Sequence, residues 1–88
     1  MINLKQKELS HWLVDQLKQR YPEVAFVRIQ ESVDDPDALW VRIAMPEDED
    51  RQIELVEHSS ELSADILDKY GYHITTMSAS PDEVKEML

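Results

Sequence analysis

The sequence predicts an α+β fold with the element order α-β-β-α-β-α, in which two long helices pack on one face of a small three-stranded sheet. Three observations lead to this prediction. Leucines recur every four residues near the N-terminus, which is helical spacing. Two runs rich in Val, Ile and aromatic residues alternate with period two over residues 24–30 and 38–45. A longer run with helical periodicity then extends to Gly71, the one glycine of the chain.

Residues 1–88 are expected to form a single domain, because 88 residues leave no room for a second core. A domain of this size buries a modest share of its surface and gains stability from a partner subunit. The chain has no cysteine, which excludes disulfides. We see neither a signal peptide nor an apolar run of about 20 residues. We therefore expect a cytoplasmic protein with no membrane partner.

The first helix is predicted over about residues 4–20. Leu9, Leu13 and Leu17 form its apolar face. Asn3 is placed to cap its N-terminus, and Pro22 ends it because the residue before a proline is pushed out of the helical conformation.

The runs at 24–30 and 38–45 are predicted to be strands. The connection between them, "ESVDDPD", contains the turn formers Asp34, Asp35 and Pro36. Because this connection is short, we expect an antiparallel hairpin.

A second long helix is predicted to end at residue 70, with Gly71 as its left-handed cap. We place Pro46 near its first turn. Its apolar stripe is expected to consist of Ile53, Val56, Leu67 and Tyr70, with Leu62 and Ile66 alongside. An alternative stays open, because residues 51–57 also alternate and would then be a strand, with the helix beginning near Ser59 or Ser60.

The stretch "YHITTM" is predicted to be the last strand. It is followed by Ser80, Pro81 and Glu83, which have the spacing of a capping box with proline at the first helical position. A short helix is therefore expected to close the chain.

Two similar tetrapeptides, "FVRI" and "WVRI", fall in the two predicted strands of the hairpin. Strand alternation predicts one face that the helices cover. That face comprises Ala25, Val27, Ile29, Leu39, Val41, Ile43 and Met45. The opposite face is then predicted to carry Phe26, Arg28, Trp40 and Arg42.

A turn centred on Asp34 would place Phe26 opposite Arg42 and Arg28 opposite Trp40, giving two crossed cation–π pairs. Because Trp and Arg are enriched at binding hot spots, these four residues are the predicted partner-binding site, with a homodimer as the expected assembly. Two other interpretations stay open. In the first, the face is a surface without a partner, on which the aliphatic stems of the arginines cover the aromatic rings. In the second, the aromatic rings stack against RNA bases.

The net charge is −10, and the segment 31–68 carries 13 acidic residues against two basic ones, Arg42 and Arg51. Such a field repels phosphate backbones and favours a basic protein partner, so we expect no nucleic acid. A plain role in solubility is the alternative. One glycine is too few for a phosphate-binding loop, so no cofactor is predicted.

Two clusters of polar residues are candidates for metal binding. His58 shares a helix face with Glu54 and Glu61, and the turn carries Asp34, Asp35 and Asp37. Both patterns occur in metal sites, but solvated helix faces and turns with polar side chains are the more frequent origin. We predict neither a metal site nor catalytic residues.

The stretches "DPDALWV" and "ELSADILDKYGYHITTMSASPDE" resemble parts of the minimal nucleotidyltransferase domain of the polymerase-beta type. The first resembles that family's Asp-x-Asp strand, and the second its closing helix, strand and cap. The chain departs from the pattern where "RIQES" replaces the strand and Gly-Ser turn, and where a proline separates Asp35 from Asp37. The resemblance therefore implies a degenerate relative without catalysis, acting as an antitoxin-type partner of a toxin protein.

The leading hypothesis is a small acidic non-catalytic interaction protein that self-associates through its open sheet face. The alternatives are the antitoxin-type relative of nucleotidyltransferases and an acidic mimic of nucleic acid that occupies a basic site on another protein.

Overall fold

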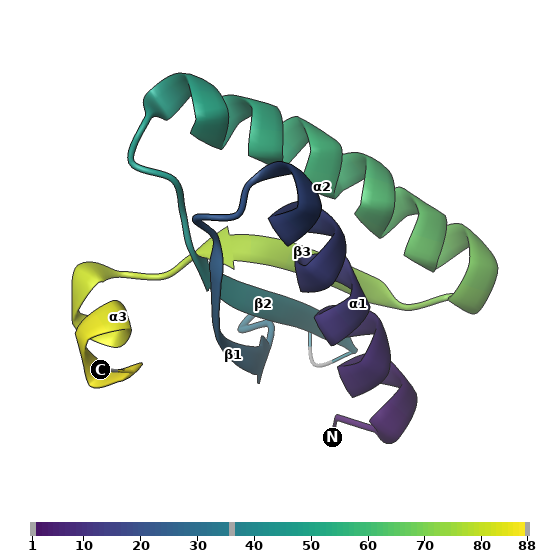
Figure 1. Ribbon diagram of the computed structural model, residues 1–88. Coiled ribbons are helices and arrows are strands. Elements are labelled where there is room, and N and C mark those ends of the chain that lie inside the picture. Colours follow the sequence, from purple (N-terminus) through teal and green to yellow (C-terminus); the bar gives the residue numbers. More distant parts are fainter. Residues whose placement is uncertain (1, 36, 88) are drawn as a thin grey trace.

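The computed structural model describes residues 2–35 and 37–87. Its elements follow the predicted order and form an α+β fold (Figure 1). They are α1 (Leu4–Arg20), β1 (Ala25–Glu31), β2 (Ala38–Ala44), α2 (Glu49–Tyr70), β3 (His73–Ser78) and α3 (Pro81–Met87). None of the helices in this described part combines the length and the apolar content that crossing a membrane requires.

The sheet has the strand order β1-β2-β3. β1 pairs with β2 antiparallel, as the short connection predicts, whereas β3 runs parallel to β2. A parallel neighbour needs a crossover, and α2 supplies it. Figure 1 shows α1 and α2 lying together over the sheet, while α3 lies apart from them near the C-terminus.

The core lies between the sheet and the two long helices. β2 contributes every second residue to it, Leu39, Val41 and Ile43, each with at most 1% of its surface exposed. The helices contribute residues that are equally closed to solvent. These are Leu13 and Leu17 of α1 and Leu55 and Ile66 of α2.

The predicted N-terminal cap of α1 is confirmed. The side chain of Asn3 accepts a hydrogen bond from the Gln6 backbone N–H at 2.8 Å, and the Gln6 side chain accepts one from the Asn3 N–H at 2.9 Å. This reciprocal pair satisfies two of the backbone N–H groups that a helix start leaves without partners.

α2 begins later than predicted. Asp48 is its N-cap and accepts a hydrogen bond from the Asp50 N–H at 3.1 Å. Pro46 therefore precedes the helix instead of lying in its first turn; it is buried, and its carbonyl accepts a hydrogen bond from Gln52 Nε2 at 2.6 Å. Residues 51–57 are helical, so the strand alternative for this segment is wrong.

The predicted apolar stripe of α2 is wrong in its four main residues, whereas Leu62 and Ile66, predicted alongside them, do face the core. Ile53, Val56, Leu67 and Tyr70 are 60%, 49%, 39% and 47% exposed. The stripe that faces the core consists of Leu62 and Ile66 together with Leu55 and Ser59, which the periodicity did not single out. Ser59 is tolerated there because its hydroxyl hydrogen-bonds the hydroxyl of Thr76 on β3, so that neither buried polar group lacks a partner.

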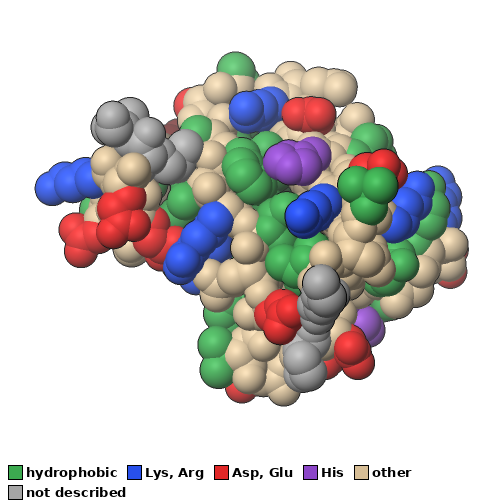
Figure 2. Space-filling model, turned by 90° about the horizontal axis from the view of Figure 1, so that it is seen from below, with side chains coloured by type: hydrophobic (Ala, Val, Ile, Leu, Met, Phe, Trp, Pro, Cys, Tyr) green, Lys and Arg blue, Asp and Glu red, His purple; other side chains and the backbone are tan. Residues whose placement is uncertain are grey.

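Acidic side chains are concentrated on and just before α2. All nine acidic residues from Glu47 to Asp68 are exposed, and only Arg51 and Lys69 oppose them on this helix. Figure 2 views the molecule from below, the side away from α2, and there Lys and Arg side chains lie interspersed with acidic and hydrophobic ones. Nine of the 19 acidic residues of the chain thus lie on or just before this one helix.

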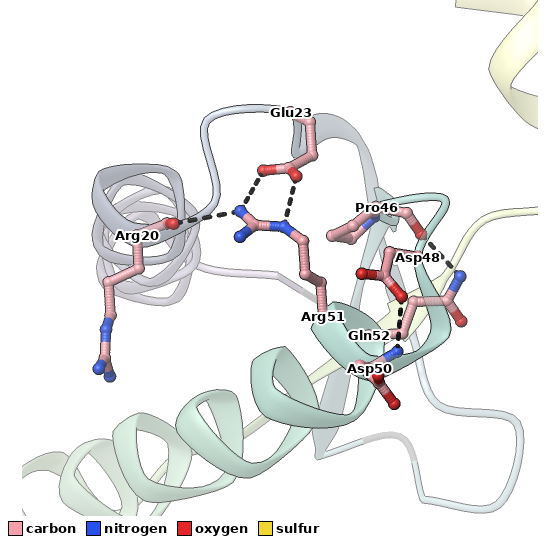
Figure 3. A network of polar contacts seen from close by, with 7 residues as sticks. All are labelled: Arg20, Glu23, Pro46, Asp48, Asp50, Arg51 and Gln52. Carbon is pink, nitrogen blue, oxygen red and sulfur yellow. Dashed lines mark hydrogen bonds and ion pairs between the residues drawn. The ribbon is translucent and has the colours of Figure 1, made fainter.

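The start of α2 is tied to the loop between α1 and β1 (Figure 3). The Arg51 guanidinium donates to both carboxylate oxygens of Glu23, at 2.7 and 2.8 Å, and lies 5.0 Å from the centre of the Tyr21 ring. The hydrogen bond from Arg51 holds the pKa of the Glu23 carboxyl below its ordinary value. A two-pronged ion pair of this kind fixes orientation as well as distance.

In the connection between β1 and β2, the Asp35 carboxylate accepts a hydrogen bond from the Asp37 N–H at 2.9 Å. This local bond is typical of aspartate in turns, as predicted. Pro36, the other predicted turn residue, lies outside the described residues.

Candidate functional site: the open sheet face

The sheet has a second face that α1 and α2 do not cover. In β2, Trp40 and Arg42 alternate with the buried residues and therefore point to this side. The β2–β3 register places Thr75 beside Trp40 and Met77 beside Arg42. We call the residues Arg28, Gln30, Trp40, Arg42, Thr75 and Met77 the open face.

Phe26 does not belong to the open face, which corrects the prediction from the tetrapeptides. The β1–β2 register shifts between Phe26 and Arg28, so Val27 is the extra residue of a β-bulge. Phe26 pairs with Ile43 and packs against the core, its ring 4.8 Å from that of His11 on α1. Val27, predicted for the helix-covered face, instead lines a surface hollow with Arg28, Glu83 and Glu86.

The predicted register is wrong as well. Arg28 lies opposite Arg42, and Gln30 lies opposite Trp40. The crossed aromatic–arginine pairs are therefore not formed. The cation–π contacts found in the described part of the chain lie elsewhere, between Lys5 and Tyr70 and between Arg51 and Tyr21.

Two arginines side by side on neighbouring strands would repel each other, and Glu83 of α3 compensates for this. Arg42 Nη2 lies 2.6 Å from Glu83 Oε1, and Arg28 Nε lies 3.3 Å from Glu83 Oε2. The side chains of Arg42 and Glu83 are 17% and 18% exposed, whereas that of Arg28 is 57% exposed. Glu83 thus ties α3 to the β1 side of the open face.

The same glutamate also belongs to the predicted capping box, which is confirmed. The Glu83 N–H donates to Ser80 Oγ at 3.2 Å, and the Ser80 N–H donates to Glu83 Oε1 at 3.3 Å. Partial burial raises the pKa of Glu83, but the hydrogen bonds from Ser80 and the charges of Arg42 and Arg28 outweigh it, so its pKa lies below its ordinary value. The carboxylate is therefore held in its charged form.

These contacts divide the predicted site residues into groups with different surroundings. Phe26 is on the core side, and Arg42 is largely enclosed by α3. Arg28 and Thr75 remain exposed and Trp40 half-buried. Trp40, Arg28 and Thr75 are the open-face residues with the most freedom to meet another molecule.

Another hollow, of about 420 Å³, lies between α1 and α2, and the sequence did not predict it. Its apolar lining consists of Leu9, Trp12, Leu62, Ile66 and Tyr70, and the charged residues Lys5, Glu8, Asp65 and Lys69 also line it. Trp12 follows the leucine stripe of α1 by helical spacing, and nothing in the spacing alone reveals that it is 41% exposed.

The residues weighed as metal ligands do not come together. Within residues 2–35 and 37–87, no group of three or more His, Asp or Glu side chains is arranged to hold a metal ion. His58 instead lies 3.5 Å from the guanidinium of Arg20, from Nδ1 to Nη1. Its neighbours Ser59 and Ser60 point to different partners, Thr76 and the Val56 carbonyl.

Comparison with protein-family models, with curated proteins and with solved structures finds no match for this chain.

Proposed function

We propose that this protein is a non-catalytic interaction protein of the cytoplasm, and that its open face binds a partner protein. The observation that carries the proposal is the placement of Trp40 beside Gln30 and Thr75, with Arg28 in the next residue pair, on a sheet face that neither long helix covers. Tryptophan and arginine contribute disproportionately to protein interfaces, because they bury a large area and form directed contacts.

Charge indicates what kind of partner fits. Arg28 keeps more than half of its side chain in solvent although Glu83 lies beside it, and Arg42 Nε is buried without a hydrogen-bond partner among the described residues. The open face therefore combines the apolar ring of Trp40 with two guanidinium groups, those of Arg28 and Arg42, which share the carboxylate of Glu83. A partner surface with an apolar side chain against Trp40 and a carboxylate near Arg28 complements it.

The test compares which proteins are captured from a lysate of the native host by three immobilised proteins. These are the unchanged chain, Trp40→Ala and Trp12→Ala. Trp12 is the matched control, since it is the other tryptophan and lies on α1, on the opposite side of the sheet. We expect a protein that is retained by the unchanged chain and by Trp12→Ala, with retention by Trp40→Ala reduced at least about tenfold, the loss typical of an interface tryptophan. Equal retention by all three would refute the proposal.

A separate measurement tests whether the protein lacks catalytic function. The resemblance to nucleotidyltransferases stays a prediction, and titration calorimetry with Mg²⁺ and nucleoside triphosphates addresses it. We expect no heat of binding; saturable heat would favour the transferase-like alternative. The acidic-mimic alternative also stays a prediction, and it places binding on α2 instead of the open face.

The sequence-based prediction assigned self-association to the open face. With Phe26 on the core side and α3 over the β1 side, less of that face is left for a second copy.

A further inference from the structure

The two edges of the sheet differ in how they are protected. β1 carries a bulge and the charged residues Arg28 and Glu31, and α3 packs against it. These are the features that keep edge strands from pairing with other chains. β3, at the other edge, has the sequence HITTMS, with no charged residue, no proline and no shift in its register with β2. In the described part of the chain no strand pairs with its outer side.

An apolar stripe lies beside this unprotected edge. Ile53, Val56 and Leu67 of α2 are 60%, 49% and 39% exposed, and exposed small residues separate them. We call Ile53, Val56, Ser60, Ala64 and Leu67 the outer stripe, because their helical spacing places them along one flank of α2.

The contacts of α2 show which flank this is. Arg51 reaches Glu23, and His58 lies beside Arg20, so the flank with Arg51 and His58 faces α1. The buried stripe, centred on Ser59, faces the sheet. The outer stripe lies on the flank of α2 across the buried stripe from the flank that faces α1. Because α1 packs over β1 and α2 over β3, that side overhangs the free edge of β3.

The outer stripe is self-complementary about its midpoint. If a second α2 lies antiparallel with Ser60 against its own copy, Ile53 meets the second copy's Leu67, and Val56 meets the second copy's Ala64. Large residues then pair at the ends and small residues at the centre, where the helices approach most closely. This symmetric pattern is what a two-fold interface requires, since each residue must serve both copies.

The strand independently indicates the same axis. Ser59, next to Ser60, hydrogen-bonds Thr76, which lies at the middle of β3. A two-fold axis near Ser60 therefore also passes the centre of β3. With the axis there, the β3 strands of the two copies would pair antiparallel along their whole length. One axis satisfies the helix and the strand together.

Charge is compatible with this arrangement. Glu54, Glu61 and Asp68 lie on the arc of α2 that faces solvent and would face outward in the pair. Glu49 and Glu57 border Ile53 and Val56 at the rim of the outer stripe, where they add to the repulsion between two chains of −10.

We propose that a second copy of this chain binds β3 and the outer stripe around a two-fold axis, making β3 and its copy the central strands of one continuous sheet. The open faces of the two copies then join into a single surface with two Trp40 side chains. This inference does not depend on the proposed function, since Trp40 is not in the interface.

Sedimentation velocity of the full chain over a concentration series is the first test. We expect a dimer that strengthens with added salt, because salt screens the repulsion between the copies. Val56→Glu should raise the dimer dissociation constant by roughly 100-fold, since the two-fold axis would bury the added charge twice. Leu4→Glu is the control: it changes an apolar residue of α1 that is 72% exposed and belongs neither to β3 nor to the outer stripe, and it should leave the dimer unchanged.

Cross-linking gives a second readout, because the chain contains no cysteine. Ser60→Cys should form a covalent dimer with a short bifunctional maleimide, whereas Glu61→Cys, on the outward arc, should not. Circular dichroism of each variant establishes that it is folded. A monomer at all concentrations, equal cross-linking of the two cysteine variants, or a dimer that Trp40→Ala dissociates and Val56→Glu does not would each overturn the proposal.

Discussion

At the end of α2 the backbone of Gly71 adopts a left-handed conformation with a φ of 76°, and its N–H donates to the Leu67 carbonyl at 2.9 Å. This single residue allows the chain to leave the helix and enter β3 at once. The space around it is open, since a Cβ added at Gly71 would have no atom within 4 Å. Any cost of replacing it therefore comes from the backbone conformation alone.

We predict that Gly71→Ala lowers the free energy of unfolding by about 1 kcal/mol, because an L-residue with a Cβ disfavours this conformation. Gly71→Asn is the control and should lose less, since asparagine adopts left-handed conformations more readily. Urea denaturation of the three proteins measures the difference. A loss of several kcal/mol in the alanine variant would mean that packing, and not conformation, requires the glycine.

At the scale of the elements, β1 shows how one inserted residue changes the surface. The bulge at Val27 moves Phe26 to the core and leaves Val27 and Arg28 on the opposite side. Beyond the bulge, alternation resumes, and Ile29 pairs with Val41 on the core side. The bulge thus places Val27, a smaller aliphatic residue, on the side of the sheet where regular alternation would have placed Phe26.

Two truncations test this arrangement of β1. Phe26→Ala should destabilise the protein by about 2–3 kcal/mol, as the ring packs against the core, whereas Val27→Ala should cost less than about 1 kcal/mol. The free energy of unfolding in urea measures both. Without the bulge the order would be reversed, with Val27 in the core, so a larger loss for Val27→Ala would contradict the structure.

At the scale of the whole molecule, ion pairs join segments that are far apart in the chain. Glu83 connects α3 to β1 and β2, and Glu23 connects the α1–β1 loop to α2. Both carboxyl groups have a pKa below the ordinary value of 4.5 in the folded chain. Each pair therefore stabilises the fold above that pH and loses its contribution as the pH falls through the folded-state pKa.

This linkage predicts how Glu83→Gln responds to pH. The variant should have a lower melting temperature than the unchanged chain at pH 7. The difference should shrink as the pH falls below 4.5 and disappear below the folded-state pKa, where the glutamate is protonated in the folded chain as well. Faster proteolysis or amide exchange within α3 at pH 7 would locate the effect. Glu86→Gln changes a neighbouring exposed glutamate of α3; it is the control and should lower the melting temperature at pH 7 by less than Glu83→Gln does. An equal gap at pH 7 and at a pH below the folded-state pKa would disprove the role of the charge.

The element order, most of the helix ends and the turn were predictable because their causes are local. Asn3, Ser80 and Gly71 act within a few residues of themselves, and the alternation of Leu39, Val41 and Ile43 is regular enough to identify the buried side of β2. Local periodicity, however, cannot rank two apolar stripes on one helix. α2 has one stripe with Leu55 and Ile66 and another with Ile53 and Leu67, and only packing against the sheet buries the first.

The amino-acid sequence by itself therefore determined which segments are helix and strand, where most of them end, and that Trp40 and Arg42 share a face. The tertiary structure decided what meets what: the bulge that turns Phe26 inward, the parallel pairing of β3 with β2, and the reach of Glu83 from α3 to two arginines. The physical reason is that side chains in a strand alternate with period two, so one extra residue reverses a face. Contacts between distant segments, in turn, depend on how the whole chain packs.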